Sequence, residues 1–510
     1  MKSKKTDQFV EVMDTTLRDG EQTPGVAFTP AEKLEIARLL LTRVKVDRLE
    51  IASARVSEGE KEAVRAILAW AEHRGCLEQM EILGFVDNHA SVDWIKSVGG
   101  KVINMLAKGS EEHCRVQLKK TPARHFDDVA AEIEYAHSQG LMVNLYLEDW
   151  SSGMRNSFGY VYEFLNRIKD LPVERVMLPD TLGVLEPTEV TTYIEWLYRG
   201  FPHLRLDFHG HNDYGVVTAN SLAAVRAGVN GIHTTINGLG ERTGNQPLAQ
   251  LAVCVNDMTG RRIRVVEKEL QHASEMVQSI SGKRCAWNMP VVGADVFTQT
   301  CGVHADGDKK GNLYANRLLP ERFGRHRNYA LGKLSGKASI DQNLETLGLD
   351  LDPEVRKKVL QEVIRLGDKK KSVSPSDLPF IIAGVLHTPL ESRLKVTDFE
   401  VSTRYNALPK ARVAVEMDGR QVESTATGDG GYDAFVKALR KCLKQFELTM
   451  PRLLDYEVRI PPGGKTDALV EATITWDTKG KSLVTTGIDS DQLVAAVLAT
   501  EKMLNLVVPR

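Results

Sequence analysis

Residues 9–53 read FVEVMDTTLRDGEQTPGVAFTPAEKLEIARLLLTRVKVDRLEIAS, two strand-like runs with an amphipathic segment between them. The runs 9–16 and 48–53 have the length and composition of buried β-strands. In residues 30–43, apolar positions recur at i, i+3 and i+4, as in a helix that packs on a sheet. The stretch therefore predicts strand, helix and strand, the unit from which parallel sheets are built.

The same alternation continues to about residue 250. Six further strand-like runs follow at 80–85, 102–107, 142–149, 175–180, 205–211 and 231–236. Amphipathic stretches such as 219–229 separate most of them. Eight such units in about 250 residues match the size of a (β/α)8 TIM barrel, which is the fold we expect. A doubly wound open sheet is the alternative that the same alternation allows.

The pattern changes after about residue 265. Residues 266–282 and 353–367 predict helices, and a loop-rich stretch, 285–335, separates them. Long irregular segments inside folded chains are often functional. We therefore expect a helical and irregular linker region, 266–390, that completes the active site of a catalytic barrel, 1–265.

The remaining residues, 391–510, contain an internal repeat of about 55 residues. Each copy predicts three strands and then a helix: 395–403, 411–417, 420–427 and 433–446, followed by 454–460, 468–476, 481–487 and 491–505. These residues show no constellation of acid, base and nucleophile. We interpret them as an α+β domain that serves regulation or assembly.

Composition restricts the class of protein. The 510 residues carry 66 basic and 68 acidic side chains, a net charge of -2, whereas a nucleic-acid-binding protein usually shows a basic excess. The sequence contains no run of about 18 apolar residues, so we expect no transmembrane helix. The six cysteines are scattered without a CxxC pair, which is typical of reduced thiols in a cytoplasmic protein. We therefore expect no nucleic-acid and no membrane partner.

Polar residues that follow the predicted strands indicate a metal site, because chemistry in a TIM barrel lies at the carboxyl ends of the strands. His209 and His211 are two residues apart on a strand, so both imidazoles point to one side. Asp19 follows the first strand, which meets the last one in a closed barrel, and Asn245 follows the eighth. This ligand set suits Mn, Zn or Co, with Mg as a further option. The alternative is a hydrogen-bonded polar cap.

Four further features are candidates for the chemistry. Arg18 is placed to stabilise a developing enolate or alkoxide oxygen, unless it forms a surface ion pair. Glu148 is a candidate general acid or base, or a residue that orients a base, although many glutamates at strand ends only cap helices. The glycines of GLGERTGN (238–245) allow close approach of backbone to a ligand or form a tight turn. His304, in the irregular segment, is either a general base that closes over the site or an exposed loop histidine.

Several motifs resemble a known family. DTTLRDGEQTPG (14–25), HGHND (209–213) and NGLGERTGN (237–245) resemble signatures of the 2-isopropylmalate, homocitrate and citramalate synthases. These are barrel enzymes of the metallolyase type named for an Asp-Arg-Glu motif, here Arg18, Asp19 and Glu21. The resemblance continues through GVHADGDKKGNLYAN (302–316) and into the C-terminal repeat, which looks like a leucine- or isoleucine-sensing domain.

The resemblance implies a role for each motif. The divalent metal would be held by Asp19, His209, His211 and Asn245. The 2-oxo acid would contact Arg18 and Thr181, and the further substrate-binding residues would be Asp306 and Asn312. A methyl proton of acetyl-CoA would be removed by His304, with Glu148 and Tyr314 near it. The enolate would then attack the keto carbon, and water would release CoA.

The oxo acid is predicted from three positions that correspond to the substrate pocket. Leu83, Leu106 and Tyr146 are bulky, so they leave space for the methyl group of pyruvate and crowd the isopropyl group of 2-oxoisovalerate. Alternatively they only fill the barrel interior. We therefore expect a citramalate synthase of isoleucine biosynthesis, with 2-isopropylmalate synthase of leucine biosynthesis as the closest rival. Other classes that we consider are a metal-dependent lyase or decarboxylase and a non-catalytic amino-acid sensor.

Regulation and assembly are also implied by the resemblance. The effector, isoleucine or leucine, would contact Tyr432, Asp433, Tyr456 and Asp467, unless the domain serves dimerisation alone. Relatives of this kind are homodimers in which the helical segment after the barrel reaches over the partner's active site. This arrangement would allow His304 to act in trans.

Overall fold

The computed structural model describes residues 8–311, 313–347, 349–368, 373, 375–386, 393–459, 470–478 and 481–507. It comprises two compact units. The first contains Met1–Phe297 and Asn316–His326, and the second contains Thr298–Ala315 and Arg327–Arg510.

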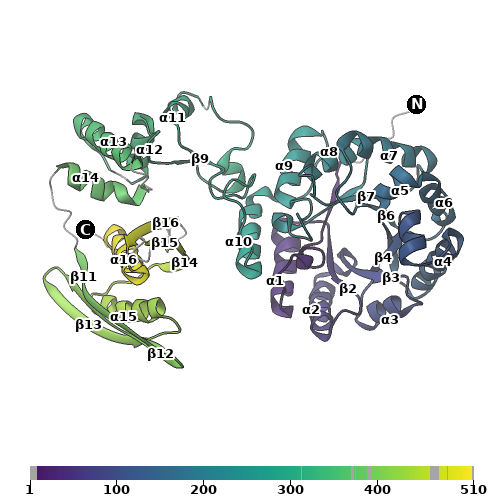
Figure 1. Ribbon diagram of the computed structural model, residues 1–510, viewed down its shortest axis with the longest axis horizontal. Helices are drawn as coiled ribbons and strands as arrows, with labels where there is room; N and C mark the ends of the chain where they lie inside the picture. Colours follow the sequence, from purple (N-terminus) through teal and green to yellow (C-terminus); the bar gives the residue numbers. More distant parts are fainter. Residues whose placement is uncertain are drawn as a thin grey trace. The chain divides into compact units, whose positions relative to one another are not determined.

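Eight parallel strands form a closed barrel in the first unit, in chain order (Figure 1). The strands are β1 (Glu11–Asp14), β2 (Arg48–Ser53), β3 (Met80–Phe85), β4 (Val102–Lys108), β5 (Met142–Glu148), β6 (Arg175–Asp180), β7 (Leu206–Gly210) and β8 (Gly231–Thr234). β1 pairs with β8, with Val12 opposite Ile232, and this pairing closes the sheet. The TIM-barrel prediction is confirmed, and the open-sheet alternative is wrong.

Helices surround the strands (Figure 1). They are α1 (Pro30–Leu39), α2 (Glu58–Arg74), α3 (Ala90–Ser97), α4 (Pro122–Ser138), α5 (Trp150–Asn156), α6 (Phe158–Ile168), α7 (Pro187–Gly200), α8 (Val217–Ala227), α9 (Leu248–Met258) and α10 (Leu270–Ser281). The start of α1 shows how local sequence fixes these elements. Thr29 and Glu32 form a reciprocal capping box, and Pro30 occupies the first helical position, where no N–H is needed.

The barrel lumen is filled by layers of side chains, because alternate residues of each strand point inward. At the amino end, the buried Arg48 pairs with Glu81 at 2.8 Å and with Asp207. Further along, four buried side chains pack together with Leu106: Met13, Leu83, Tyr146 and Met177. The carboxyl end of the lumen holds the polar residues that are considered below as a site.

The second unit begins with the segment that contains His304. Its elements are the short parallel strands β9 (Thr298–Gln299) and β10 (Asn328–Tyr329), and the helices α11 (Gly302–Lys309), α12 (Lys337–Thr346), α13 (Pro353–Asp368) and α14 (Leu378–Leu386). The expectation that His304 lies in an irregular segment is wrong, because the residue lies on α11. The sequence of α11 has no apolar repeat, so periodicity did not reveal this helix.

The C-terminal repeat forms two antiparallel three-stranded sheets, each followed by a helix. The first copy is β11 (Leu394–Arg404), β12 (Ala407–Met417), β13 (Arg420–Thr427) and α15 (Gly431–Gln445). The second copy is β14 (Arg452–Arg459), β15 (Val470–Thr478), β16 (Lys481–Asp489) and α16 (Gln492–Val507). Both copies contribute to one core, which includes Phe435 from the first and Trp476 from the second. The predicted α+β repeat is confirmed.

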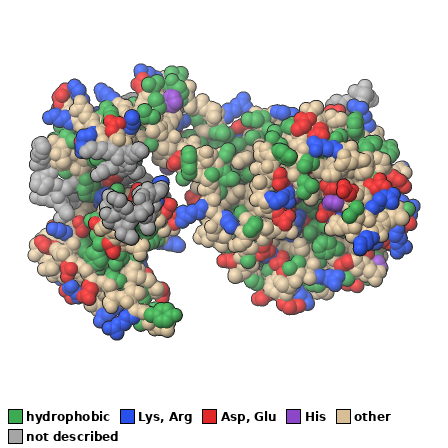
Figure 2. All heavy atoms as spheres, in the orientation of Figure 1, with side chains coloured by type: hydrophobic (Ala, Val, Ile, Leu, Met, Phe, Trp, Pro, Cys, Tyr) green, Lys and Arg blue, Asp and Glu red, His purple; other side chains and the backbone are tan. Residues whose placement is uncertain are grey.

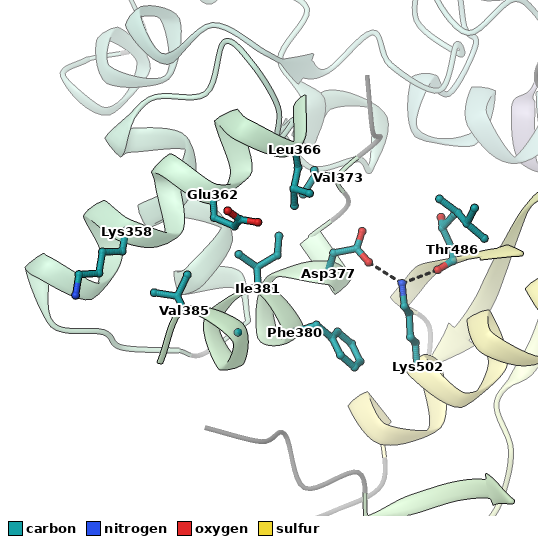
Figure 3. A pocket seen from close by; sticks show the side chains of 12 residues that line it. Lys358, Glu362, Leu366, Val373, Asp377, Phe380, Ile381, Val385, Thr486 and Lys502 are labelled. Atoms are coloured by element: carbon teal, nitrogen blue, oxygen red, sulfur yellow. Dashed lines mark hydrogen bonds and ion pairs between the residues drawn. The ribbon is translucent and has the colours of Figure 1, made fainter. Parts of the chain in front are cut away.

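A cavity of about 680 Å³ in the second unit is lined by α13 and α14 and by residues of β16 and α16 (Figure 3). Lys502 on α16 donates hydrogen bonds to the Asp377 carboxylate at 2.9 Å and to the carbonyl of Thr486 at 2.7 Å. Its ammonium also lies 5.7 Å from the centre of the Phe380 ring. Lys502 therefore ties the C-terminal repeat to the short helix that precedes α14.

The surface carries mixed charge. Figure 2 shows acidic and basic side chains interspersed over the face that is drawn, which agrees with the near-zero net charge. Within the described ranges, none of the helices has the length and apolar character needed to span a membrane.

Candidate active site

Three predicted metal ligands converge at the carboxyl end of the barrel. One ligand atom each from Asp19, His209 and His211 lies within 4.8 Å of the others. His209 Nε2 is 3.3 Å from Asp19 Oδ2 and 3.3 Å from His211 Nε2. The histidines lie at the end of β7, and Asp19 lies in the turn after β1, where its N–H bonds the carbonyl of Thr15. The predicted alternation along the strand therefore brings both imidazoles to one place.

Asn245 lies beside these residues, because it forms a β-bridge with His211. Its Nδ2 donates to the carbonyl of Leu239 at 2.9 Å. A Cβ atom at Gly240, whose φ is +152°, would lie 2.2 Å from this Nδ2. Glycine is needed here both for the backbone conformation and for the close approach to Asn245.

The donor set fits a divalent cation. Among the described residues, Asp19 Oδ1 and Asn245 Oδ1 are buried and have no hydrogen-bond partner, and the two imidazoles present Nε2 to each other and, for His209, to Asp19. Buried polar atoms without partners are costly, and such atoms often bind an ion. Carboxylate, imidazole and amide ligands together suit ions of intermediate softness.

The electrostatics of the cluster agree with metal binding. Burial, together with the neighbouring His209, lowers the pKa of His211 to about 4, so its ring is neutral near pH 7. Burial alone would raise the pKa of Asp19, but Arg18 and His209 hold that pKa well below its ordinary range. A neutral imidazole and an ionised carboxylate are the forms that bind metal.

Arg18 connects the cluster to the apolar part of the lumen. Its Nε donates to Glu50 at 2.5 Å, and its guanidinium lies 3.2 Å from Asp19 Oδ2 and 3.5 Å from the Tyr146 hydroxyl. That hydroxyl is 3.0 Å from His233 Nδ1. Burial lowers the pKa of His233 to about 3, so the ring is neutral and its Nδ1 can accept a hydrogen bond from the Tyr146 hydroxyl.

The three predicted pocket residues lie together. Leu83 and Tyr146 are buried in one cluster with Met13 and Met177, and Leu106 packs against it. Tyr146 belongs both to this cluster and to the polar contacts of Arg18. A buried apolar cluster therefore lies next to the guanidinium of Arg18.

Glu148 and Thr181 lie at the ends of neighbouring strands, and two residues not predicted from the sequence contact them. Glu148 forms an ion pair with Lys108. The Thr181 hydroxyl accepts the N–H of Asp149 at 2.9 Å, and its carbonyl accepts a hydrogen bond from Arg242 at 2.8 Å. Lys108 is two positions beyond Leu106 on β4, so strand alternation could have indicated it. The contact of Arg242 depends on loop conformation and has no such signal.

His304 and Tyr314 belong to the second unit, where their ring centres are 4.2 Å apart. A Cβ atom at Gly307 would lie 2.5 Å from the Tyr314 ring, so this glycine permits the contact. Asp306 on α11 pairs at 2.6 Å with Lys310, the residue that follows this helix. Asn312 lies outside the described residues.

Two of the predicted effector residues stack on each other. The rings of Tyr432 and Tyr456 are 4.8 Å apart, and the Tyr432 hydroxyl lies 2.7 Å from Thr500 Oγ1. Asp433 instead accepts the N–H of Asp429 and pairs with Lys437. Asp467 lies outside the described residues.

Glu21, the third member of the Asp-Arg-Glu motif, supports the fold. It pairs at 2.7 Å with Lys33, whose side chain is fully buried and also binds Glu60. Lys33 Nζ donates to the carbonyl of Leu17 at 2.9 Å. Glu21 therefore helps to hold the turn that presents Arg18 and Asp19.

Comparison with known proteins gives the same assignment over almost the whole chain. The family model described as HMGL-like matches residues 9–277, and one described as homocitrate synthase post-HMGL domain-like matches 291–371. The LeuA allosteric (dimerisation) domain matches 372–508. A Methanopyrus kandleri protein provisionally named (R)-citramalate synthase is 34% identical, covering 96% of this chain and 94% of that protein.

Two proteins of Methanocaldococcus jannaschii are also similar. The (R)-citramalate synthase is 30% identical over 98% of this chain and 99% of its own length. The 2-isopropylmalate synthase is 31% identical over 98% of this chain and 95% of its own length. The chain belongs to the family of citramalate and 2-isopropylmalate synthases. Enzymes of this family are acyltransferases that condense acetyl-CoA with 2-oxo acids and generally use a divalent metal.

Proposed function

We propose that this chain condenses acetyl-CoA with pyruvate and water to give (R)-citramalate and CoA. The observation that carries the choice of pyruvate is the apolar cluster around Tyr146, which packs directly beside Arg18. On this proposal, the bulky Leu83, Leu106 and Met177 of this cluster would accommodate the methyl group of pyruvate and crowd a branched group. The names of several relatives support the same substrate.

The barrel residues have complementary roles in this proposal. A divalent ion held by Asp19, His209, His211 and Asn245 would supply Lewis-acid polarisation of the substrate carbonyl. Arg18, fixed by Glu50, binds and orients the 2-oxo acid together with Thr181. The Tyr146 hydroxyl lies 3.0 Å from His233 Nδ1 and can donate a hydrogen bond to it, which leaves the hydroxyl oxygen as an acceptor for the Arg18 guanidinium. We keep Mn, Zn, Co and Mg as candidate ions, because the ligand set is mixed.

Proton removal from the acetyl methyl group is assigned to His304, with Glu148 and Tyr314. The enolate carbon forms the new C–C bond to the keto carbon of pyruvate, whose carbonyl oxygen becomes the tertiary alcohol after protonation. Water then adds to the thioester carbonyl, and the C–S bond breaks to release CoA as a thiol. Asp306 and Asn312 are the further substrate contacts in this proposal.

The competing substrate is 2-oxoisovalerate, the reaction of a 2-isopropylmalate synthase, and a relative with that name supports it. Release of CoA with each oxo acid, followed with a thiol reagent, gives kcat/KM for both. We expect pyruvate to be preferred by at least about tenfold. A higher value for 2-oxoisovalerate would reverse the assignment. A Leu106→Ala variant should lower the ratio of kcat/KM for pyruvate to kcat/KM for 2-oxoisovalerate, because the smaller side chain makes space for the branched group.

The same assay tests two other classes of protein. Absence of acetyl-CoA-dependent thiol release with every 2-oxo acid would exclude a synthase and favour a lyase, a decarboxylase or a non-catalytic sensor. We also propose that the protein is a cytoplasmic homodimer whose residues 391–510 sense isoleucine or leucine. Calorimetric titration of the full chain with each amino acid, repeated with Tyr432→Ala, tests the sensing role.

A further inference from the structure

Glu148 takes part in the proposed proton removal, and it forms an ion pair with Lys108, which has no role in that reaction so far. Lys108 ends β4 and Glu148 ends β5, and the two residues lie opposite each other in the strand register. One layer deeper, Leu106 lies opposite Tyr146 in the apolar cluster. Because side chains alternate along strands, Lys108 and Glu148 also point into the lumen, at its carboxyl end.

The backbone at Lys108 is held on both sides. Its N–H donates to His125 Nε2 at 3.1 Å, and its carbonyl accepts the Tyr160 hydroxyl at 2.8 Å. The next residue, Gly109, donates its N–H to the carbonyl of Glu148 at 2.6 Å. A Cβ atom at Gly109 would lie 2.4 Å from the carbonyl oxygen of Leu147, so only glycine allows the two strand ends to approach this closely.

These contacts limit the directions that the lysine side chain can take. Lys108 is only 8% exposed, whereas a lysine in an ordinary surface ion pair is free to move in water. The Glu148 side chain is 25% exposed, so part of it is accessible from the carboxyl end of the barrel. The ammonium of Lys108 binds Oε2 of this carboxylate.

We propose that Lys108 is a positioning residue that directs the Glu148 carboxylate toward the substrate for proton transfer. The inference rests on the proposed function, because it gives Glu148 a role in that chemistry. Proton transfer requires the carboxylate within hydrogen-bonding distance, and a charge-assisted bond to a fixed ammonium restricts its position. A purely structural ion pair would stabilise the barrel without affecting turnover.

Substitution Lys108→Met removes the charge and keeps most of the side-chain length. We expect kcat to fall about tenfold while KM for both substrates changes less than about threefold, and Lys108→Arg to retain most of kcat. In a Glu148→Gln background, Lys108→Met should cause no further loss. The matched control is Lys120→Met, which removes a lysine that pairs with Asp128 at 2.8 Å outside the lumen, and its kcat should be unchanged.

An unchanged kcat in Lys108→Met, or losses that add in the double variant, would overturn the positioning role. Thermal unfolding of the wild type, both single variants and the double variant measures the coupling between the two side chains without substrate. Absence of coupling would also overturn the inference, since the pair would then not form. If the wild type turns over normally and Lys108→Met is unaffected, the positioning role is overturned and the proposed function stands. If the wild type releases no CoA with any 2-oxo acid, both the proposed function and the positioning role are overturned.

Discussion

His209 and His211 show how a two-residue spacing becomes a site. Each imidazole lies within 3.3 Å of a second ligand atom, and both rings belong to the end of β7. This geometry follows directly from strand alternation, so the sequence was sufficient to predict it. The contacts of Arg18 with Glu50 and Tyr146 were not predictable in the same way, because they join the turn after β1 to residues of β2 and β5.

Replacement of His209 by alanine should remove the central ligand of the cluster. We expect kcat to fall by about 100-fold or more, since a bound metal contributes several kcal/mol to the transition state. Metal content after dialysis and CoA release measure the two effects, and an unaltered metal stoichiometry would contradict the assignment. His137→Ala, at an exposed position of α4, is the control and should retain metal and activity.

Acidification should destabilise the barrel through His125. Burial, followed by the nearby Lys120, lowers the pKa of His125 to about 4, while an unfolded histidine titrates near 6.5. Between these values the unfolded chain binds a proton that the folded chain does not, so stability falls as pH decreases from about 6.5 to about 4.

The contribution of His125 to this pH dependence is at most about 3 kcal/mol. His125→Gln keeps an acceptor for the Lys108 N–H and removes the titration. Urea denaturation between pH 7.5 and pH 4.5 should therefore show a smaller decrease in the free energy of unfolding for the variant. Equal pH dependence in both proteins would show that His125 is not the group responsible.

Among the elements, the eight strands were the most predictable because each combines an apolar run with regular spacing from the next. The predicted strand 102–107 stopped one residue short of Lys108, and this difference concealed the lysine that pairs with Glu148. The helix α11 was missed because its residues include two glycines and three charged side chains without an apolar stripe. Tertiary contacts, such as the Tyr314 ring against Gly307, stabilise it instead.

The short helix Pro320–Phe323 returns the chain to the first unit after the His304 segment. Arg322 fixes it through ion pairs with Glu267 and, at 2.8 Å, with Asp257. Phe323 is buried and stacks on Phe297. The segment that carries His304 therefore leaves from and returns to the barrel unit.

The Arg322→Ala substitution should weaken the attachment of the short helix Pro320–Phe323 to the rest of the first unit. Loss of its charge-assisted hydrogen bonds costs about 2 kcal/mol, and we expect faster proteolysis near residues 316–326 and a lower kcat. Limited proteolysis with mass spectrometry, together with CoA release, measures both effects. Arg38→Ala, which removes an exposed pair with Glu35, should change neither. Unchanged proteolysis of Arg322→Ala would show that Arg322 is not needed to hold the segment.

At the scale of the whole molecule, the C-terminal repeat has one core built from two copies, and its family model is named for dimerisation and allostery. The sequence predicted the repeat because each copy preserves the order of three strands and a helix. It could not show that Lys502 contacts Asp377, because 125 residues separate the two along the chain.

We expect a homodimer in solution. Light scattering coupled to size-exclusion chromatography should give about 113 kDa, twice the 56.6 kDa mass of one chain. This result should hold with and without an amino-acid effector. A mass of one chain at micromolar concentration would contradict the expectation.

The buried charges at the amino end of the barrel have a kinetic consequence. Arg48, Glu81 and Asp207 occupy that end of the lumen, so substrates have access only from the carboxyl end. On the proposed function, pyruvate lies deeper, against Tyr146 and Met177, and the bulky thioester lies above it. On this arrangement we expect pyruvate to bind before acetyl-CoA, and CoA to dissociate before citramalate. Acetyl-CoA that binds first would block access to the pyruvate site and give a complex that cannot react.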